Sequence, residues 1–240
     1  MQRPAIAITM VLALVSTARA ELHDRWETLL QRYVDDDGRV AYRSLRRESE
    51  SVLDAYLQSL EVIAPSTLSP PEQIAFWLDA YNARVVRGIL DGYSAEGIIG
   101  RKRFFAFYRF RLAGAQRTLD EIEHEILRKQ FAEPRVHFAL VCASTSCPKL
   151  RREAYRGDRL DAQLDDQVRM FLSDPHRNQI GPGDIIRLSA IFKWFGDDFI
   201  KAKGSVLAFI HQYVPGAGNP RIEYLDYDWT LNAQPGQRPE

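Results

Sequence analysis

The segment that determines the fold most clearly is apolar on nearly every helical face, and it reads Ile74-Ala75-Phe76-Trp77-Leu78-Asp79-Ala80-Tyr81-Asn82-Ala83-Arg84-Val85-Val86. A helix that is hydrophobic all round is typical of a protein interior. The residues just before it, Ser69-Pro70-Pro71-Glu72, supply a serine N-cap and proline in the first turn. We therefore predict a buried helix from Pro70 to about Gly92.

Two polar residues share one face of this helix, because Asp79 and Asn82 are three positions apart. Buried polar groups cost about 1–3 kcal/mol each when unpaired, so these side chains must hold partners or face a cleft. One interpretation is that they bond the backbone of a neighbouring loop. The other makes Asn82 an orienting or oxyanion-stabilising group of a catalytic site.

The rest of the chain predicts a helix-rich α+β fold, with one domain packed on a small, mostly antiparallel sheet. Apolar periodicity and turn residues indicate further helices over 23–34, 44–60, 119–131, 148–155, 160–172 and 206–214, and short strands over 39–42, 103–112, 136–142, 185–188 and 222–224. No low-complexity linker or repeat divides residues 21–240, so a single domain is expected.

The N-terminal residues are typical of a secretory signal peptide. Arg3 precedes an apolar run from Ala5 to Val15, and small residues follow as far as Ala20. The run is shorter than the roughly 20 residues that a spanning helix needs. We expect cleavage near Ala20, an exported protein in the periplasm or secreted, and no stable insertion in a membrane.

Charge gives no reason to expect a polyanionic partner. Without Arg3 and Arg19, the 32 basic residues become 30 against 32 acidic ones, a net charge of −2. A near-neutral chain has no electrostatic attraction to nucleic acid. The expected ligand is a small molecule or is peptide-like.

The candidate chemistry lies in Arg135-Val136-His137-Phe138-Ala139-Leu140-Val141-Cys142-Ala143-Ser144-Thr145-Ser146-Cys147-Pro148, which holds both cysteines of the chain and one of its five histidines. A regular strand over 136–142 would place His137 and Cys142 on opposite faces and about 16 Å apart. Cys147 precedes the expected helix start at Pro148, where the helix dipole and nearby basic residues would favour a thiolate. Cys147 is therefore the predicted reactive sulfur.

Partners for such a sulfur are available elsewhere in the sequence. His137 could act as its base, and so could His124 from the expected helix 119–131. Asp198 could hydrogen-bond a histidine as the third member of a triad.

Three interpretations of the cysteines stay open at this point: a Cys142–Cys147 disulfide, a metal site and a reactive thiol. The spacing of His137, Cys142 and Cys147 matches no common zinc motif and lacks a fourth ligand, so neither a metal nor another cofactor is predicted.

Five motifs together resemble the family called domain of unknown function 547: residues 76–83, 119–128, 137–148, 188–199 and 227–229. Two positions depart from what the resemblance leads us to expect, with Asp79 in place of asparagine and Ala143 in place of glycine. The resemblance implies a fold and a shared site rather than an activity. There is a weaker resemblance to papain- and transglutaminase-like enzymes, under which His137 matches the histidine that begins a strand.

The sequence thus predicts a thiol-dependent hydrolase or acyltransferase on a peptide-like or small amide substrate. Cys147 would be the nucleophile, His137 or His124 the base, and Asn82 or Asp198 the orienting group. The alternatives are a non-catalytic periplasmic binding or scaffold domain with a Cys142–Cys147 disulfide, and a thiol–disulfide redox protein. The residues alone do not decide whether the site is catalytic.

Overall fold

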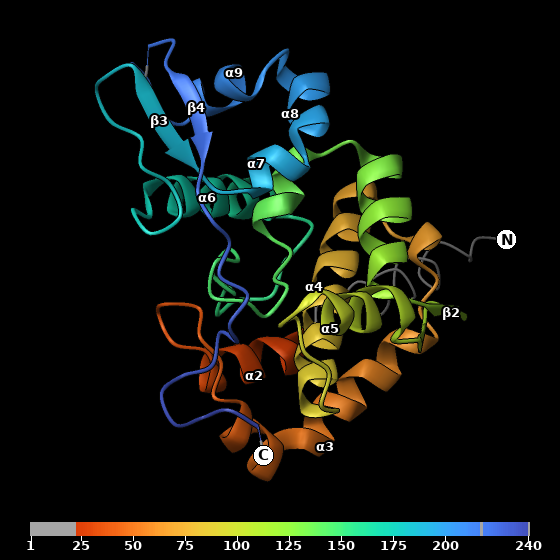
Figure 1. Ribbon diagram of the computed structural model, residues 1–240. Coiled ribbons are helices and arrows are strands. Elements are labelled where there is room, and N and C mark those ends of the chain that lie inside the picture. The colour runs from red at the N-terminus through yellow and green to blue at the C-terminus, as the bar shows by residue number, and fades with distance from the viewer. Residues whose placement is uncertain (1–22, 217, 240) are drawn as a thin grey trace, which may run out of the picture.

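A computed structural model of the chain describes residues 23–216 and 218–239 (Figure 1). The predicted signal peptide, residues 1–20, lies outside the described residues. No helix in these two ranges combines the length and the hydrophobicity that crossing a membrane requires.

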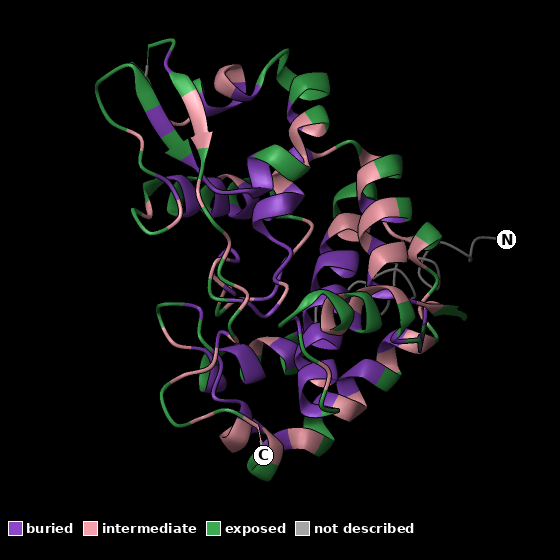
Figure 2. Cartoon of the chain, in the orientation of Figure 1, coloured by how far each residue is buried: buried purple, intermediate pink, exposed green. Residues whose placement is uncertain are grey.

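Helices form the first part of the molecule: α2 (Asp24–Tyr33), α3 (Tyr42–Glu61), the short 3₁₀ helix η1 (Pro65–Thr67) and α4 (Pro70–Leu90). The helix α4 begins at the predicted position, where Ser69 and Glu72 form a capping box. Its residues from Ala75 to Val86 are all buried, and Figure 2 shows α4 largely in the colour of buried residues. The prediction of a buried central helix is confirmed.

The middle of the chain contains α5 (Ile98–Lys102), the π-helical segments η2 (Arg103–Phe107) and η3 (Glu121–Phe131), the 3₁₀ helix η4 (Pro134–Phe138), and the strands β1 (Phe110–Leu112) and β2 (Ala115–Arg117). The strands β1 and β2 form an antiparallel hairpin. The strand predicted over 103–112 is confirmed only at its end, because Arg103–Phe107 is helical.

The strand predicted over 136–142 is wrong. Pro134 opens η4, whose start is capped by the Glu133 side chain, and the following residues have no regular secondary structure. A side chain from α4 supplies the partners that a neighbouring strand would give: the Asn82 amide nitrogen donates to the Ala139 carbonyl at 2.9 Å, and its oxygen accepts from the Val141 N–H at 2.9 Å.

The last part of the chain contains α6 (Leu160–Ser173), β3 (Ile185–Leu188), α7 (Ile191–Trp194), α8 (Gly196–Lys203), α9 (Val206–His211) and β4 (Arg221–Tyr224). The strands β3 and β4 pair in parallel. In Figure 1 they lie with α8 and α9 at one end of the molecule, and α2 and α3 lie at the other. The helix-rich α+β class is confirmed, and the named strands of the described residues form two separate two-stranded sheets.

Buried apolar side chains form two clusters that meet at η4. The first joins α2, α3, α4 and η3, and it includes Val136 and Leu140. The second surrounds Phe138 with aromatic rings from α6 to α9. Fully burying one such side chain contributes about 1.5–3 kcal/mol. Val136 and Leu140 are therefore held in the first cluster and Phe138 in the second, which fixes the orientation of the chain between them. His137 and the cysteines lie along this junction.

Candidate functional site

The two cysteines are bonded to each other. Cys142 and Cys147 form a disulfide with their Cα atoms 6.2 Å apart, and no cysteine of the described residues is free. The loop between them turns sharply, because Ala143 has φ +61° and the Cys147 N–H donates to the Ser144 carbonyl at 3.1 Å. Ala143 is one of the two positions that depart from the family resemblance, and glycine would adopt this left-handed conformation without strain.

The two sulfurs have different surroundings. Cys147 is 2% exposed, whereas Cys142 is only partly buried. The Cys147 Sγ accepts the backbone N–H of Cys142 at 2.9 Å and the Tyr227 hydroxyl at 3.2 Å. The Ser144 hydroxyl in turn donates to the Tyr227 oxygen at 3.3 Å. These donors would stabilise negative charge on Cys147.

The helix predicted from Pro148 is absent, so the helix-dipole argument for Cys147 is wrong. Residues 148–155 are not helical. The basic side chains expected to act on the sulfur form ion pairs elsewhere: Lys149 with Asp37, Arg151 with Asp166, and Arg152 with Asp36. The Tyr155 N–H donates to Asp79 on α4 at 3.1 Å, which ties this segment to α4 in a non-helical conformation.

A histidine and a carboxylate lie next to this loop. His137 Nε2 is 2.8 Å from Asp198 Oδ2, and Arg128 Nε donates to the same carboxylate at 2.6 Å. The hydrogen bonds from His137 and Arg128 lower the pKa of Asp198, while burial lowers the pKa of His137. The imidazole is therefore neutral at pH 7, with its proton on Nε2.

The other nitrogen of this ring has no partner. His137 is 3% exposed, and its Nδ1 makes no hydrogen bond. The ring stacks on Phe195 with centroids 3.9 Å apart. A lone pair in such a position can accept a proton from a bound group.

His124 contributes a second neutral imidazole from η3. Its Nδ1 is 3.0 Å from Arg128 Nη1, so it accepts from the guanidinium. Burial lowers the pKa of His124. Arg128 thus bonds both His124 and Asp198.

The disulfide and both histidines line one pocket of about 190 Å³. The lining residues are Tyr81, Phe105, Asp120, Glu123, His124, His137, Leu140, Cys142, Cys147, Pro148, Ile191, Trp194, Phe195, Tyr227 and Trp229. Of the residues singled out from the sequence, Cys142, Cys147, His124 and His137 therefore come together here, and Asp198 contacts His137 from behind the lining.

Glu123 is the residue that sequence reasoning missed. Burial, with the charge of Asp120 as the next cause, raises the pKa of Glu123 to about 7. The Tyr81 hydroxyl donates to its Oε2 at 3.4 Å. The sequence predicted an α-helix here, in which neighbouring residues such as Glu123 and His124 point in directions about 100° apart. The structure has a π-helix instead, and its i→i+5 pattern changes which side chains share a face. No signal in the sequence marks that change.

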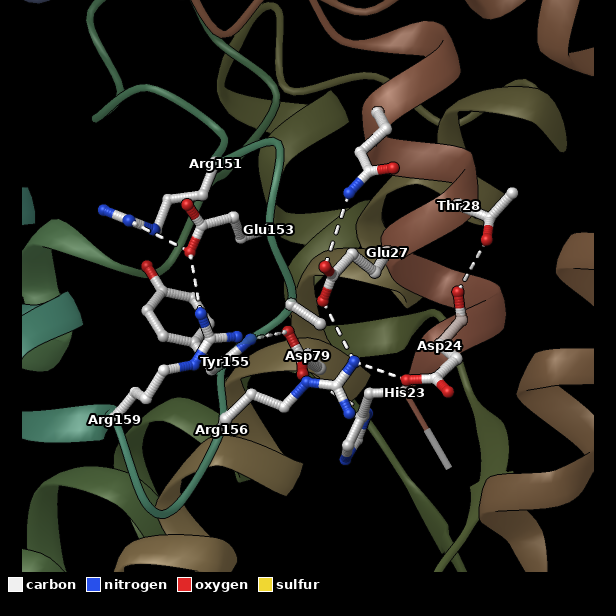
Figure 3. Close-up of polar contacts among 12 residues, drawn as sticks. His23, Asp24, Glu27, Thr28, Asp79, Arg151, Glu153, Tyr155, Arg156 and Arg159 are labelled. Carbon is white, nitrogen blue, oxygen red and sulfur yellow. Dashed lines mark hydrogen bonds and ion pairs between the residues drawn. The ribbon is translucent and has the colours of Figure 1, made fainter. Parts of the chain in front are cut away.

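Asp79 and Asn82, the two polar residues of α4 singled out from the sequence, do not line this pocket. Both amide atoms of Asn82 bond the backbone of residues 139 and 141, so this side chain positions the segment before Cys142. Asp79 belongs to a buried polar cluster beneath α2, shown in Figure 3, where its Oδ2 lies 3.2 Å from His23 Nδ1. Burial raises the pKa of Asp79 and lowers that of His23 to about 3.

Metal ligands do not gather in the described part of the chain, where no group of three or more His, Cys, Asp or Glu side chains could hold an ion.

The molecule is thus a helix-rich α+β protein with a disulfide and two neutral histidines in one pocket. Residues 65–172 match the model of the family described as Protein of unknown function, DUF547, the family that the sequence motifs resemble. The matched residues include α4, both pocket histidines and both cysteines. No curated protein and no solved structure matches the chain, and the weaker resemblance to papain-like enzymes rests on the sequence alone.

Proposed function

We propose that the pocket is a thiol–disulfide exchange centre with Cys142–Cys147 as its redox pair. The observation that carries the proposal is the unequal placement of the two bonded sulfurs in a pocket. Cys142 is partly exposed, and Cys147 is buried with two hydrogen-bond donors. Exchange reactions need one accessible sulfur and a good leaving group.

The reaction begins when a substrate thiolate attacks the Sγ of Cys142. A substrate–Cys142 bond forms, the disulfide breaks, and its electron pair leaves with Cys147 as a thiolate. A second substrate thiolate then attacks the substrate sulfur of the mixed disulfide and releases Cys142. The substrate dithiol is oxidised by two electrons, the protein is reduced to two thiols, and a disulfide compound from the surroundings restores it.

Glu123, which lines the pocket, is the group suited to proton transfer. The pKa of Glu123 is raised to about 7, so this side chain can accept or donate a proton at neutral pH. Tyr227, which bonds the Cys147 sulfur, feels the charge of Glu123. Both residues line the pocket that contains the leaving sulfur.

A purely structural role for the disulfide is the less favoured alternative. The cysteines are five residues apart, and closing so short a loop in the unfolded chain stabilises a fold by about 2 kcal/mol in the chain-entropy model. Because the described part of the chain already contains two buried apolar clusters, the fold depends little on so small a contribution from the disulfide.

A thiol-dependent hydrolase or acyltransferase is the second candidate, and the His137–Asp198 contact favours it. In the reduced protein, Cys147 would attack the substrate carbonyl, and His137 Nδ1 would take up its proton, with Asp198 holding the ring through Nε2. This activity would be present only after the disulfide is reduced.

The test follows the pair through reduction and reoxidation. The mature protein is incubated without denaturant, first with dithiothreitol and then with oxidised glutathione, and after each step thiols are counted by rapid alkylation in denaturant and intact mass. Exchange predicts two thiols that appear and disappear reversibly in the folded protein. It also predicts that Cys147→Ser forms a mixed disulfide with oxidised glutathione much faster than Cys142→Ser does. A disulfide that resists reduction until the protein unfolds would overturn the proposal in favour of a structural role.

The second candidate has its own readout. Reduced wild-type protein would hydrolyse a panel of peptide amides and esters, whereas the oxidised protein and a reduced His137→Gln variant would not. Equal hydrolysis by reduced wild type and His137→Gln would exclude this mechanism.

A further inference from the structure

We propose that this pocket binds a primary ammonium group on a short alkyl chain, so that its substrates are aminothiols or thiol peptides with a lysine side chain near the sulfur. The inference rests on the proposed exchange function and names the class of substrate for the same site.

The charges of the lining select for a cation. Among the described residues, the pocket is lined by two carboxyl side chains, Asp120 and Glu123, and by no lysine or arginine. Both histidines are neutral because burial lowers their pKa values. The neighbouring guanidinium of Arg128 is paired with Asp198. The lining therefore offers a bound cation two carboxyl groups, whereas an anion would meet no lysine or arginine within it.

Aromatic rings also line the pocket. The ring centroids of Trp194, Tyr227 and Trp229 lie 4.6–5.7 Å from one another, and Trp194 is 46% exposed. The faces of such rings attract ammonium and guanidinium groups. One of them already holds a cation, since the Arg101 guanidinium lies 4.3 Å from the Trp229 centroid. Aromatic rings and carboxyl groups in one pocket are two features that stabilise a desolvated ammonium.

The volume limits the length of the ligand. A pocket of about 190 Å³ is smaller than the roughly 300–1,000 Å³ of sites that hold drug-sized ligands. An ammonium with four methylenes has five non-hydrogen atoms and is of a size that such a pocket can enclose. The disulfide lines the same pocket, so a thiol a few bonds from the ammonium would lie beside Cys142.

The unpaired nitrogen of His137 is independent support for a ligand. It belongs to a lining residue that is 3% exposed, and it makes no hydrogen bond within the protein. A buried polar atom of this kind costs about 1–3 kcal/mol unless a bound group pairs with it. An ammonium has three donors, enough to bond both carboxyl groups of the lining.

The site should bind more tightly as the pH rises through about 7, where Glu123 loses its proton while an alkylammonium keeps its own. The groups that act on Glu123 come from three helices and are Asp120, Arg128, Tyr81 and Asp198.

Binding is tested with n-butylammonium chloride against uncharged n-butanol, by calorimetry and tryptophan fluorescence on the oxidised wild-type protein. We expect saturable binding of n-butylammonium at least tenfold tighter than of n-butanol. The double variant Asp120→Asn/Glu123→Gln should lose that preference. Glu125→Gln is the matched control, because Glu125 is exposed on the same helix and pairs with Lys129. Equal binding of the two probes, or an unchanged preference in the double variant, would overturn the ammonium site.

The substrate class is tested with two thiols, 2-aminoethanethiol and 2-mercaptoethanol. For each thiol, the rate at which it reduces the Cys142–Cys147 disulfide is divided by the rate at which it reduces a small reference disulfide, which corrects for the reactivity of the thiol itself. We expect 2-aminoethanethiol to be favoured at least fivefold, and the double variant to abolish the difference. Equal ratios for the two thiols, together with n-butylammonium binding that is unchanged in the double variant, would overturn this inference and leave exchange intact. A disulfide inert to both thiols, together with carboxyl-dependent binding of n-butylammonium, would overturn the exchange function and leave the cation site intact.

Discussion

Tyr227 is the residue on which the chemistry of the sulfur pair most depends. Its hydroxyl donates to the Cys147 Sγ, the predicted leaving sulfur. The Tyr227→Phe variant loses one hydrogen bond to developing negative charge, worth about 1 kcal/mol, so reduction by a thiol should slow by about fivefold. Stopped-flow measurement of disulfide reduction checks this. Tyr224→Phe, at an exposed position on β4, is the control and should react at the wild-type rate. Equal rates for all three proteins would show that Tyr227 does not assist the leaving sulfur.

Asp79 makes the stability of the protein depend on pH. Burial raises the pKa of Asp79 in the folded state, so above its unfolded value of about 3.9 the folded protein holds the proton more tightly. Stability from this group is therefore lost as pH rises. His23 has a lowered pKa of about 3 and acts in the opposite direction up to its unfolded value near 6.5. The two effects offset each other between about 4 and 6.5, and the loss from Asp79 dominates above that range.

The Asp79→Asn variant separates these contributions, because an amide needs no proton. Unfolding by urea is measured at pH 5, 7 and 8.5 for both proteins. Because His23 is present in both, the difference between their free energies reports Asp79 alone, and it should move in favour of the variant by up to about 1.4 kcal/mol per pH unit above about 3.9, until Asp79 is ionised in the folded wild type. A difference between the two proteins that does not change with pH would contradict the raised pKa of Asp79. The same substitution places the residue that the family resemblance leads us to expect at this position.

At the scale of elements, the sequence predicted helices well and the cysteine segment poorly. The helix α4 was recognised because an apolar run with a serine and proline start is a local signal. The irregular path of residues 139–147 depends on Asn82, which is 57 positions before Ala139 in the chain. No local pattern contains a contact of that separation, so the period of the apolar residues indicated a strand instead.

Asn82 should accordingly be a structural residue. The Asn82→Ala variant leaves a buried carbonyl and a buried N–H without partners, and it should lose about 2–4 kcal/mol of stability. Urea unfolding measures the loss. Asn82→Asp keeps the bond to the Val141 N–H, but it places a buried carboxylate oxygen against the Ala139 carbonyl and should also lose stability. If Asn82→Ala kept wild-type stability and lost only its activity, the orienting role considered from the sequence would be supported instead.

The end of η3 carries a strained residue. Ala132 has φ +49°, is exposed, and ends this π-helical segment in the left-handed conformation that glycine adopts without strain. The Ala132→Gly variant should be more stable by about 0.5–1 kcal/mol, as measured by urea unfolding. Ala202→Gly, at an exposed position within α8, is the control and should be less stable by a similar amount. Destabilisation by both substitutions would contradict the strain.

At the scale of the whole molecule, the candidate site lies where two apolar clusters meet. Helix η3 supplies Glu123 and His124, and Asp120 lies just before it. Helix η4 supplies His137, and α7 with the residues after β4 supplies the aromatic rings. The sequence identified the cysteines, the histidines and Asp198 as residue types suited to chemistry. Their common pocket could not be predicted, because it depends on how separate clusters pack rather than on any local pattern.

The disulfide is expected to contribute little to this packing. The double variant Cys142→Ser/Cys147→Ser should remain folded, with a circular dichroism spectrum like that of wild type and a loss of about 2 kcal/mol in urea unfolding. A variant that fails to fold, or loses much more, would indicate that the pair holds the molecule together.

The most direct measurement of the central claim is a redox titration of the folded protein in glutathione buffers, read by alkylation and intact mass. Exchange predicts that the fraction of protein with two free thiols follows the buffer potential and is the same when approached from the oxidised and the reduced side, with native circular dichroism throughout. A pair that stays oxidised across the range, and yields thiols only in denaturant, would contradict the account.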